Sequence, residues 1–172
     1  DDPVKEIMGK MSNFKTLDEE NNAVVPLATQ DGMKAVKYIR EHANEYKVDP
    51  KRVGFIGFSA GGTLTMSVVY SADDASRPNF VAPIYAYENA IIGSNMPKEK
   101  TPIFVAVAGD DQLGFMPHSI NIYKKWFDAK QPAELHIYEK GGHGFGMRKT
   151  NTSSEGWIEN FGNWLKMQGY LK

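Results

Sequence analysis

The chain has 172 residues, of which 41% are hydrophobic and 24% charged, and its formal net charge is −1. This composition is ordinary for one globular domain, and because no basic block stands out, nothing in the sequence indicates a nucleic-acid surface. Without cysteine there is no disulfide framework, thiolate nucleophile or cysteine-ligated zinc, and no apolar run is long enough to span a membrane.

The N-terminal segment DDPVKEIMGKM begins with Asp rather than Met and has no signal-peptide pattern. We therefore expect a processed product, an expressed segment or a piece of a longer polypeptide. Residues 1–25 are mostly polar and are expected to form a loop-like lead-in with room for a short helix.

A helical pattern begins at Pro26 and is expected to end before Pro50, because the residue preceding a proline avoids helical angles. Its apolar residues recur every three or four positions, which predicts one buried stripe. The residues of this stripe are Val36, Ile39, Ala43 and Tyr46.

Strands and helices then alternate along the chain. The expected strands are residues 52–58, 79–87, 103–108 and 133–140, although Pro83 is unusual inside a strand. The expected helices are residues 60–70, residues 118–130 with Ile120, Tyr123 and Phe127 on one side, and a last amphipathic helix from Trp157. The alternation predicts an α/β fold with a parallel sheet, and the first strand reads as buried on both faces.

A glycine-rich segment, GFSAGG at residues 57–62, joins the first strand to the next helix. Phosphate binding is disfavoured because Thr63 stands where the Walker motif requires Lys, and the dinucleotide spacing G-x-G-x-x-G is absent. The segment does satisfy G-x-S-x-G, in which Ser59 would be a nucleophile on a strained strand-to-helix turn.

In that reading the flanking glycines, Gly57 and Gly61, are required because side chains there would collide. The backbone N–H of Ala60, at a helix N-terminus, would serve in the oxyanion hole. The alternative reading is a glycine-rich turn with no chemistry.

A serine nucleophile needs a histidine base, and the chain has four histidines. His42 lies in the first helix, His118 opens a later helix and His136 lies inside a strand. His143 lies in GGHGFG just after the fourth strand, at the carboxyl end where parallel sheets place their active sites. His143 is therefore the predicted base.

The third strand ends in AGDDQLG, which offers two carboxylates as the acid that orients the histidine. Asp111 is preferred and Asp110 is the alternative, with the second carboxylate capping or supporting the loop. Asp73 and Asp74 follow a helix and are expected in a solvated turn. The resulting order, serine, acid, histidine, is that of the α/β-hydrolases.

The motifs GFSAGG, AGDDQLG and KGGHGFGMR, in this order, resemble the α/β-hydrolase esterases that act on plant polysaccharides, namely the acetyl xylan esterases and feruloyl-esterase-like, or xylanase-like, enzymes. The resemblance runs from about Pro26 to the C-terminus. It implies a serine carboxylic-ester hydrolase with Ser59 as nucleophile, His143 as base and Asp111 as acid. It also implies an acylated saccharide as substrate, no metal or organic cofactor, and a secreted or periplasmic setting.

The sequence departs from this family at its N-terminus. Family members carry further strands and a His-Gly-Gly-type loop that donates a second oxyanion N–H, and the four predicted strands match the last four of roughly eight. Residues 1–172 are therefore expected to be the C-terminal portion of one α/β-hydrolase catalytic domain. We expect an N-terminal fragment of the same protein or a second copy to complete the sheet, and weak activity from this chain alone.

Two rival functions remain open. A peptidase of the same fold would use the same three residues, although it usually adds a gating domain. The second rival is an inactive hydrolase fragment, or a module that binds sugars through exposed aromatic residues. The helical spacing of Trp126, Trp157 and Trp164 instead favours packing of these residues in the core. The short segment from Glu88 to Lys100 leaves no room for a large lid, which favours small acyl groups.

Overall fold

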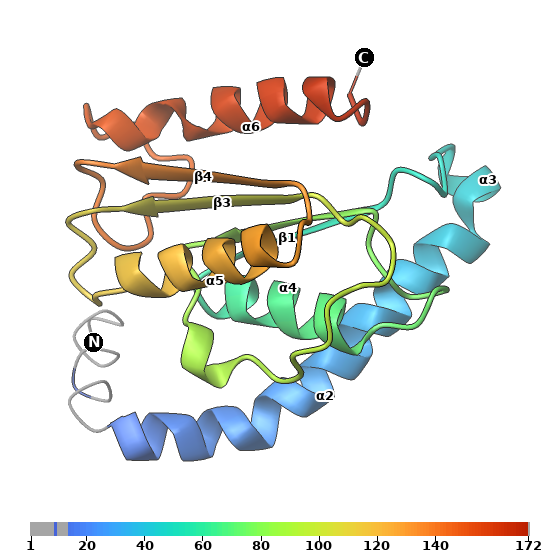
Figure 1. Ribbon diagram of the computed structural model, residues 1–172, viewed down its shortest axis with the longest axis horizontal. Coiled ribbons are helices and arrows are strands. Elements are labelled where there is room, and N and C mark those ends of the chain that lie inside the picture. The colour runs from blue at the N-terminus through green and yellow to red at the C-terminus, as the bar shows by residue number, and fades with distance from the viewer. Residues whose placement is uncertain (1–8, 10–13, 172) are drawn as a thin grey trace.

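The computed structural model describes residue 9 and residues 14–171. Helices and strands alternate from residue 54 onward, as the sequence predicts (Figure 1). In chain order the elements are α2 (Phe14–Glu41), α3 (Ala43–Tyr46), β1 (Gly54–Phe58), α4 (Ala60–Ser71), β2 (Phe80–Ile84), η1 (Glu88–Ala90), β3 (Ile103–Ala108), α5 (Met116–Asp128), β4 (Ala133–Tyr138), η2 (Ser153–Gly156) and α6 (Trp157–Met167).

The first helix is longer than predicted. Residues 14–25, expected as a loop-like lead-in, belong to α2, and Pro26 lies inside this helix rather than at its start; the remainder of the lead-in, apart from Gly9, falls outside the described residues. A proline inside a helix removes one backbone hydrogen bond, and the polar residues before it conceal the helical period.

The predicted buried stripe is interrupted where α2 gives way to α3. Val36 and Ala43 are buried, but Tyr46 is 45% exposed. The helical phase changes here because α2 ends at Glu41 and the chain turns at His42 before α3 begins.

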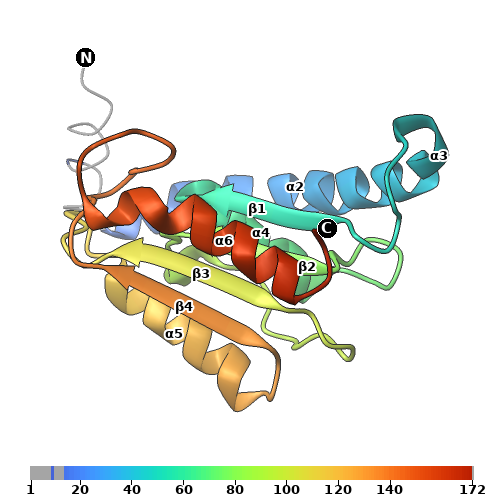
Figure 2. The same cartoon turned by 90° about the horizontal axis from the view of Figure 1, so that it is seen from above.

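The four predicted strands are confirmed and form one parallel sheet in the order β1-β2-β3-β4. Helix α6 covers one face of this sheet, while α4 and α5 cover the other and α2 lies outside α4 (Figures 1 and 2). Because all four strands run the same way, the loops after β1, β2, β3 and β4 gather at one edge of the sheet. That edge is where the candidate residues lie.

The first strand is not buried on both faces, contrary to the prediction for residues 52–58. In β1 the side chains of Ile56 and Phe58 are 42% and 39% exposed. The reason is that β1 is an edge strand, next to β2 alone among the described strands, and that α6, which covers the face opposite α4, packs mainly against β3. The face of the sheet beside β1 is therefore apolar and partly open.

The hydrophobic core has one part on each face of the sheet. On the α6 side, Trp157 and Trp164 pack against strand residues such as Phe104, and on the other side Trp126 packs with residues of α4. All three tryptophans are fully buried, which confirms their predicted role in the core. On α5, Tyr123 and Phe127 stack on each other, as expected of residues on one side, but Ile120 and Phe127 are exposed and the buried residues of this helix are Ser119, Ile122 and Trp126. No helix in the described part of the chain combines the length and hydropathy needed to cross a bilayer.

Candidate active site

Ser59 lies on a sharp turn between β1 and α4. Its backbone angles, φ 55° and ψ −118°, are strained for a residue with a side chain, as the sequence predicts for this turn. The Ser59 N–H donates to the carbonyl of Ile84 at 2.9 Å, which ties the turn to the end of β2. The turn therefore holds the serine at the carboxyl edge of the sheet.

The glycines beside Ser59 differ in how tightly they are packed. A Cβ on Gly57 would lie 1.9 Å from the carbonyl oxygen of Gly61, so Gly57 tolerates no side chain, as predicted. A Cβ on Gly61 would meet nothing within 4 Å, so the prediction that Gly61 excludes larger residues is wrong. Gly62 is the second restricted position, because a Cβ there would lie 2.8 Å from that of Ala86. The close approach of α4 to the end of β2 therefore requires glycine at position 62.

Three of the predicted residues meet at this edge. The Oγ atom of Ser59 lies 2.8 Å from Nε2 of His143, and Nδ1 of His143 lies 2.9 Å from Oδ2 of Asp111. The Asp111 side chain is fully buried and that of His143 is 14% exposed. A hydroxyl, an imidazole and a carboxylate are therefore connected by hydrogen bonds. The carboxylate is shielded from solvent, whereas the imidazole remains partly accessible.

The two adjacent carboxylates contact different groups. Asp111 accepts the backbone N–H of Leu113 through Oδ1, at 2.8 Å, and reaches His143 through Oδ2. Asp110 instead accepts the N–H groups of Gly141 and Gly142, at 2.9 and 2.8 Å, through its Oδ1. This division agrees with the prediction that one carboxylate faces the histidine and the other supports the loop.

Ala60 is the first residue of α4, directly after Ser59. The first N–H groups of a helix lack intrahelical acceptors, and the helix dipole makes this end favourable for negative charge. The Ala60 N–H therefore belongs to the first turn of α4, where negative charge is favoured, in the residue that directly follows Ser59.

Three further residues contact His143, and the sequence did not identify them. The Oε1 atom of Gln112 accepts the His143 N–H at 2.8 Å. The rings of Tyr85 and Phe115 each have their centroid 5.0 Å from that of the imidazole. Gln112 follows Asp111 in AGDDQLG and could have been suspected from that position, whereas no local signal marks the two aromatic residues.

His42, His136 and the second acidic pair lie outside this cluster, whereas His118 adjoins it, because its ring centroid lies 5.6 Å from that of Phe115 while its Nδ1 lies 3.8 Å from Glu88. His42 contacts the Tyr38 carbonyl at the end of α2, and His136 pairs with Glu134 within β4. Asp73 accepts hydrogen bonds from Ser76 in the turn after α4, as expected of a solvated turn. Within residue 9 and residues 14–171, no group of three or more His, Asp or Glu side chains is arranged to hold a metal ion.

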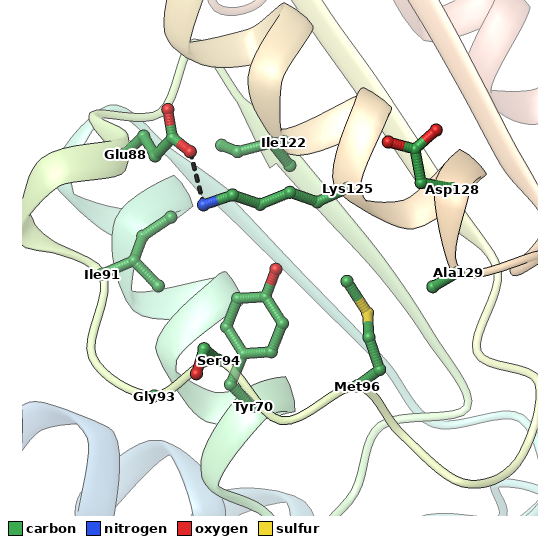
Figure 3. Close-up of a pocket in the computed structure, with 10 residues that line it drawn as sticks. All are labelled: Tyr70, Glu88, Ile91, Gly93, Ser94, Met96, Ile122, Lys125, Asp128 and Ala129. Carbon is green, nitrogen blue, oxygen red and sulfur yellow. Dashed lines mark ion pairs between the residues drawn. The ribbon is translucent and has the colours of Figure 1, made fainter.

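A pocket of about 450 Å³ lies between α4, α5 and the segment after η1, and no triad residue lines it (Figure 3). Glu88 and Lys125 form an ion pair of 2.7 Å at one end, and the Tyr70 hydroxyl points toward them. Burial, assisted by the negative charge of Glu88, raises the pKa of Tyr70 to about 12, so this phenol stays protonated at neutral pH. Because Tyr70 lies near the far end of α4 from Ser59, this pocket is separate from the candidate active site.

The Asp110 carboxylate gives the histidine loop a pH-dependent support. Its pKa is lowered from 3.8, chiefly by the N–H of Gly142, with Gly141 and Lys140 adding to the effect. A lowered pKa means that the support is complete above the unfolded-state pKa and is lost as pH falls through the folded-state pKa. We expect wild type to be more stable than Asp110→Asn by a constant margin above about pH 5, and this margin to shrink toward pH 3.

Urea unfolding at several pH values measures this margin. Asp74→Asn is the matched control, because the Asp74 side chain is 97% exposed and forms only a solvated ion pair with Arg77, at 3.4 Å. A margin for Asp110→Asn that stays constant down to pH 3 would contradict the assignment of loop support to its ionised form.

Comparison with protein families identifies one family whose model matches nearly the whole chain. The sequence model of the Dienelactone hydrolase family matches residues 5–169. A curated acetylxylan esterase from Xylanibacter ruminicola is 26% identical over 164 residues, an alignment that covers 76% of this chain and 33% of that protein.

Solved structures share the arrangement of strands and helices. The crystal structure of an acetyl ester-xyloside bifunctional hydrolase from Caldicellulosiruptor lactoaceticus is 22% identical, with a TM-score of 0.72 over 84% of this chain and 66% of that one. The carboxylesterase Cest-2923 from Lactobacillus plantarum is 17% identical, with a TM-score of 0.69 over 84% of this chain and 68% of that one. The fold is therefore that of the α/β-hydrolases, as predicted, and the chain spans only part of the length of these relatives.

Proposed function

Because the chain belongs to the dienelactone hydrolase family, we propose that it cleaves carboxylic esters through an acyl-enzyme formed on Ser59. The observation that carries the proposal is the continuous set of hydrogen bonds from Ser59 Oγ through His143 to Asp111. A serine hydroxyl is a weak nucleophile until an adjacent base removes its proton, and this arrangement supplies that base.

In the proposed reaction, Nε2 of His143 takes the Ser59 proton as Oγ attacks the ester carbonyl carbon. Asp111 accepts the hydrogen bond of Nδ1–H, which fixes the tautomer that leaves Nε2 free to accept the proton. The imidazolium then gives its proton to the alkoxy oxygen, and the C–O bond breaks to leave the acyl group on Ser59. A water molecule, deprotonated by His143, attacks this acyl-enzyme and regenerates the hydroxyl while the carboxylic acid leaves.

The N–H of Ala60 is the proposed oxyanion donor that belongs to this chain. Negative charge develops on the carbonyl oxygen as the tetrahedral intermediate forms, and the N-terminus of α4 is oriented to stabilise that charge. A second donor, where supplied by residues outside this chain, would be worth about a hundredfold in rate. We therefore expect slow turnover from the 172-residue chain alone.

An acylated saccharide is the proposed substrate class. The support comes from the relatives, one named as an acetylxylan esterase and one as an acetyl ester-xyloside hydrolase. The short segment between β2 and β3, whose only regular element is η1, favours an open site and small acyl groups.

Parallel assays of three substrates test the reaction class: p-nitrophenyl acetate, acetylated xylo-oligosaccharides and a dipeptide anilide. We expect hydrolysis of both esters, with no cleavage of the anilide above the buffer rate. Cleavage of the anilide with a kcat/KM equal to that of the esters would favour the peptidase alternative. An absence of turnover on all three would favour the inactive-fragment alternative.

We also propose that the free edge of β1 pairs with a strand from a longer form of this polypeptide. An edge strand presents unpaired N–H and C=O groups, and here the apolar side chains of Ile56 and Phe58 are exposed beside them. The relatives are longer than this chain, which favours the same polypeptide as the source of the strand. A second copy of this chain is the competing occupant.

Light scattering after size exclusion distinguishes the two sources. We expect the 172-residue chain to self-associate in a concentration-dependent way, Ile56→Lys to reduce that association, and a longer form of the polypeptide to be monomeric. Ile120→Lys is the control, because Ile120 is 37% exposed but lies on α5, away from the edge. A discrete dimer that persists in the longer form and is lost in Ile56→Lys would assign the edge to a second copy.

A further inference from the structure

Tyr85, the residue after β2, has an unusual backbone conformation. Its φ is 39°, in the left-handed region that bulky residues rarely adopt and that costs about 1–3 kcal/mol. Among the described residues, four other non-glycine residues have positive φ, and three of them (Lys47, Lys130 and Asn151) lie in exposed positions. The fourth is Ser59, so the two strained residues that are not exposed are the candidate nucleophile and Tyr85.

The strained segment connects both ends of the Ser59–His143 hydrogen bond. On one side, the carbonyl of Ile84 accepts the Ser59 N–H at 2.9 Å. On the other side, the ring of the next residue, Tyr85, contacts the imidazole of His143 with a centroid separation of 5.0 Å and an interplanar angle of 65°. The Tyr85 N–H is anchored in turn to the carbonyl of Ala106 at 2.8 Å. The end of β2 thus contacts Ser59 and His143 through consecutive residues.

The loop that carries His143 offers little conformational restraint of its own. Gly142 and Gly144 flank the histidine, both with positive φ, and glycine is the least restricted residue in the backbone. Asp110 and Gln112 hold the backbone of this loop through its N–H groups, but the orientation of the imidazole ring depends on the groups that the ring touches. These are the hydrogen bonds to Ser59 and Asp111 and the rings of Tyr85 and Phe115, the second of which meets the imidazole at 88°.

We propose that Tyr85 is a positioning residue for His143, whose ring holds the imidazole in the orientation that reaches Ser59 and Asp111 together. The strained backbone turns the Tyr85 ring from the strand end onto the imidazole, and Phe145, with its ring centroid 4.8 Å from that of Tyr85, holds the ring in place. Proton transfer depends steeply on geometry, and a displacement of about 1 Å costs on the order of a hundredfold in rate.

The aromatic ring, rather than the hydroxyl, carries this role. Burial raises the pKa of the Tyr85 phenol, so it is uncharged at neutral pH, and only 3% of the residue is exposed. The phenol is hydrogen-bonded to the backbone of Gly146, whereas the ring itself meets the imidazole at an interplanar angle of 65°. Tyr85→Phe should therefore keep the imidazole of His143 in its orientation, and Tyr85→Leu should not.

The test combines kinetics with a direct observation of the imidazole. We expect Tyr85→Leu to lower kcat for p-nitrophenyl acetate about ten- to a hundredfold with little change in KM, and Tyr85→Phe to stay within about threefold of wild type. Long-range ¹H–¹⁵N spectra of the His143 ring should show the single Nδ1–H tautomer in wild type and Tyr85→Phe, and a mixture of tautomers in Tyr85→Leu. Phe115→Leu, which removes the second ring, should shift the spectra in the same direction and serves if Tyr85→Leu does not fold.

Tyr138→Leu is the matched control, because Tyr138 contacts the same Phe145 ring, at 6.3 Å, and His136 but not His143. A Tyr85→Leu protein with unchanged kcat and an unchanged His143 spectrum would overturn the proposal, as would an equal loss in the control. The inference rests on the proposed role of His143, but the spectra need no turnover. If wild type hydrolyses no ester but the His143 ring still changes from one tautomer to a mixture in Tyr85→Leu, the proposed function is contradicted. The positioning role of Tyr85 would stand in that case.

Discussion

Replacing Ser59 with alanine is expected to lower kcat/KM for p-nitrophenyl acetate roughly 10⁴-fold or more, to the background rate. The substitution removes the Oγ atom that lies 2.8 Å from His143, so no acyl-enzyme can form, while the base and the acid remain in place. Removing one member of such a triad eliminates nearly all of its effect, because the members act as a unit. Initial rates at fixed protein concentration, with the free energy of unfolding measured alongside, check this expectation.

Ser71→Ala is the control for this prediction. Ser71 is the last residue of α4, the helix that begins after Ser59, and it is exposed. Each substitution removes one Oγ atom, from the residue before α4 or from its last residue, so a general effect of losing a hydroxyl at a helix end would appear in both variants and the loss of activity in only one. Retention of more than a few per cent of activity by Ser59→Ala would contradict the acyl-enzyme mechanism.

Replacing Gly57 with alanine is expected to destabilise the fold by roughly 3 kcal/mol or more. Overpacking a tight site usually costs about 1–3 kcal/mol, and here the new methyl would lie 1.9 Å from a backbone oxygen of Gly61 and 2.6 Å from Oγ1 of Thr65. A backbone atom cannot move aside as a flexible side chain can, so α4 must shift away from β1. Such a shift would also carry Ser59 away from His143 and abolish the reaction of Ser59 with a serine-directed fluorophosphonate probe.

The same substitution at Gly61 is the control, since a Cβ there meets nothing within 4 Å. Alanine is a better helix former than glycine by about 1 kcal/mol, so Gly61→Ala should leave stability unchanged or raise it slightly. Equal destabilisation of the two variants in urea unfolding would contradict the packing described for the turn.

Much of the fold could be predicted because its signals are local. Apolar runs bounded by glycine and proline gave the positions of the strands, and their alternation with helices gave a parallel sheet. The parallel arrangement then placed Ser59, Asp111 and His143 at one edge of the sheet, and the structure brings these three together.

The wrong predictions concern features that depend on residues distant in sequence. Whether β1 is buried on both faces depends on its place in the sheet and on which helices pack over it, and the spacing of apolar residues does not contain that information. The freedom around Gly61 depends on what packs against α4, and G-x-S-x-G requires a glycine there only where a neighbouring group approaches. Proline within α2 illustrates a third limit, because tertiary packing can retain a residue that isolated helices disfavour.

The aromatic contacts to His143 could not be predicted from the sequence for a similar reason. Tyr85 lies 58 positions before His143 along the chain, and its backbone, with positive φ, is held by the hydrogen bond of its N–H to Ala106 in β3. Phe115 is the residue directly before α5. Motifs identify the reacting groups, whereas the residues that orient them are found from contacts.

Reaction with a fluorophosphonate probe, followed by peptide mass mapping, tests the central claim most directly. The probe phosphonylates a serine only where a base has activated it, and this step needs no second oxyanion donor to be detectable. We predict one modified site, Ser59, with labelling lost in Ser59→Ala and strongly slowed in His143→Ala. An unlabelled Ser59 in folded wild-type protein, or equal labelling of several serines, would contradict the account.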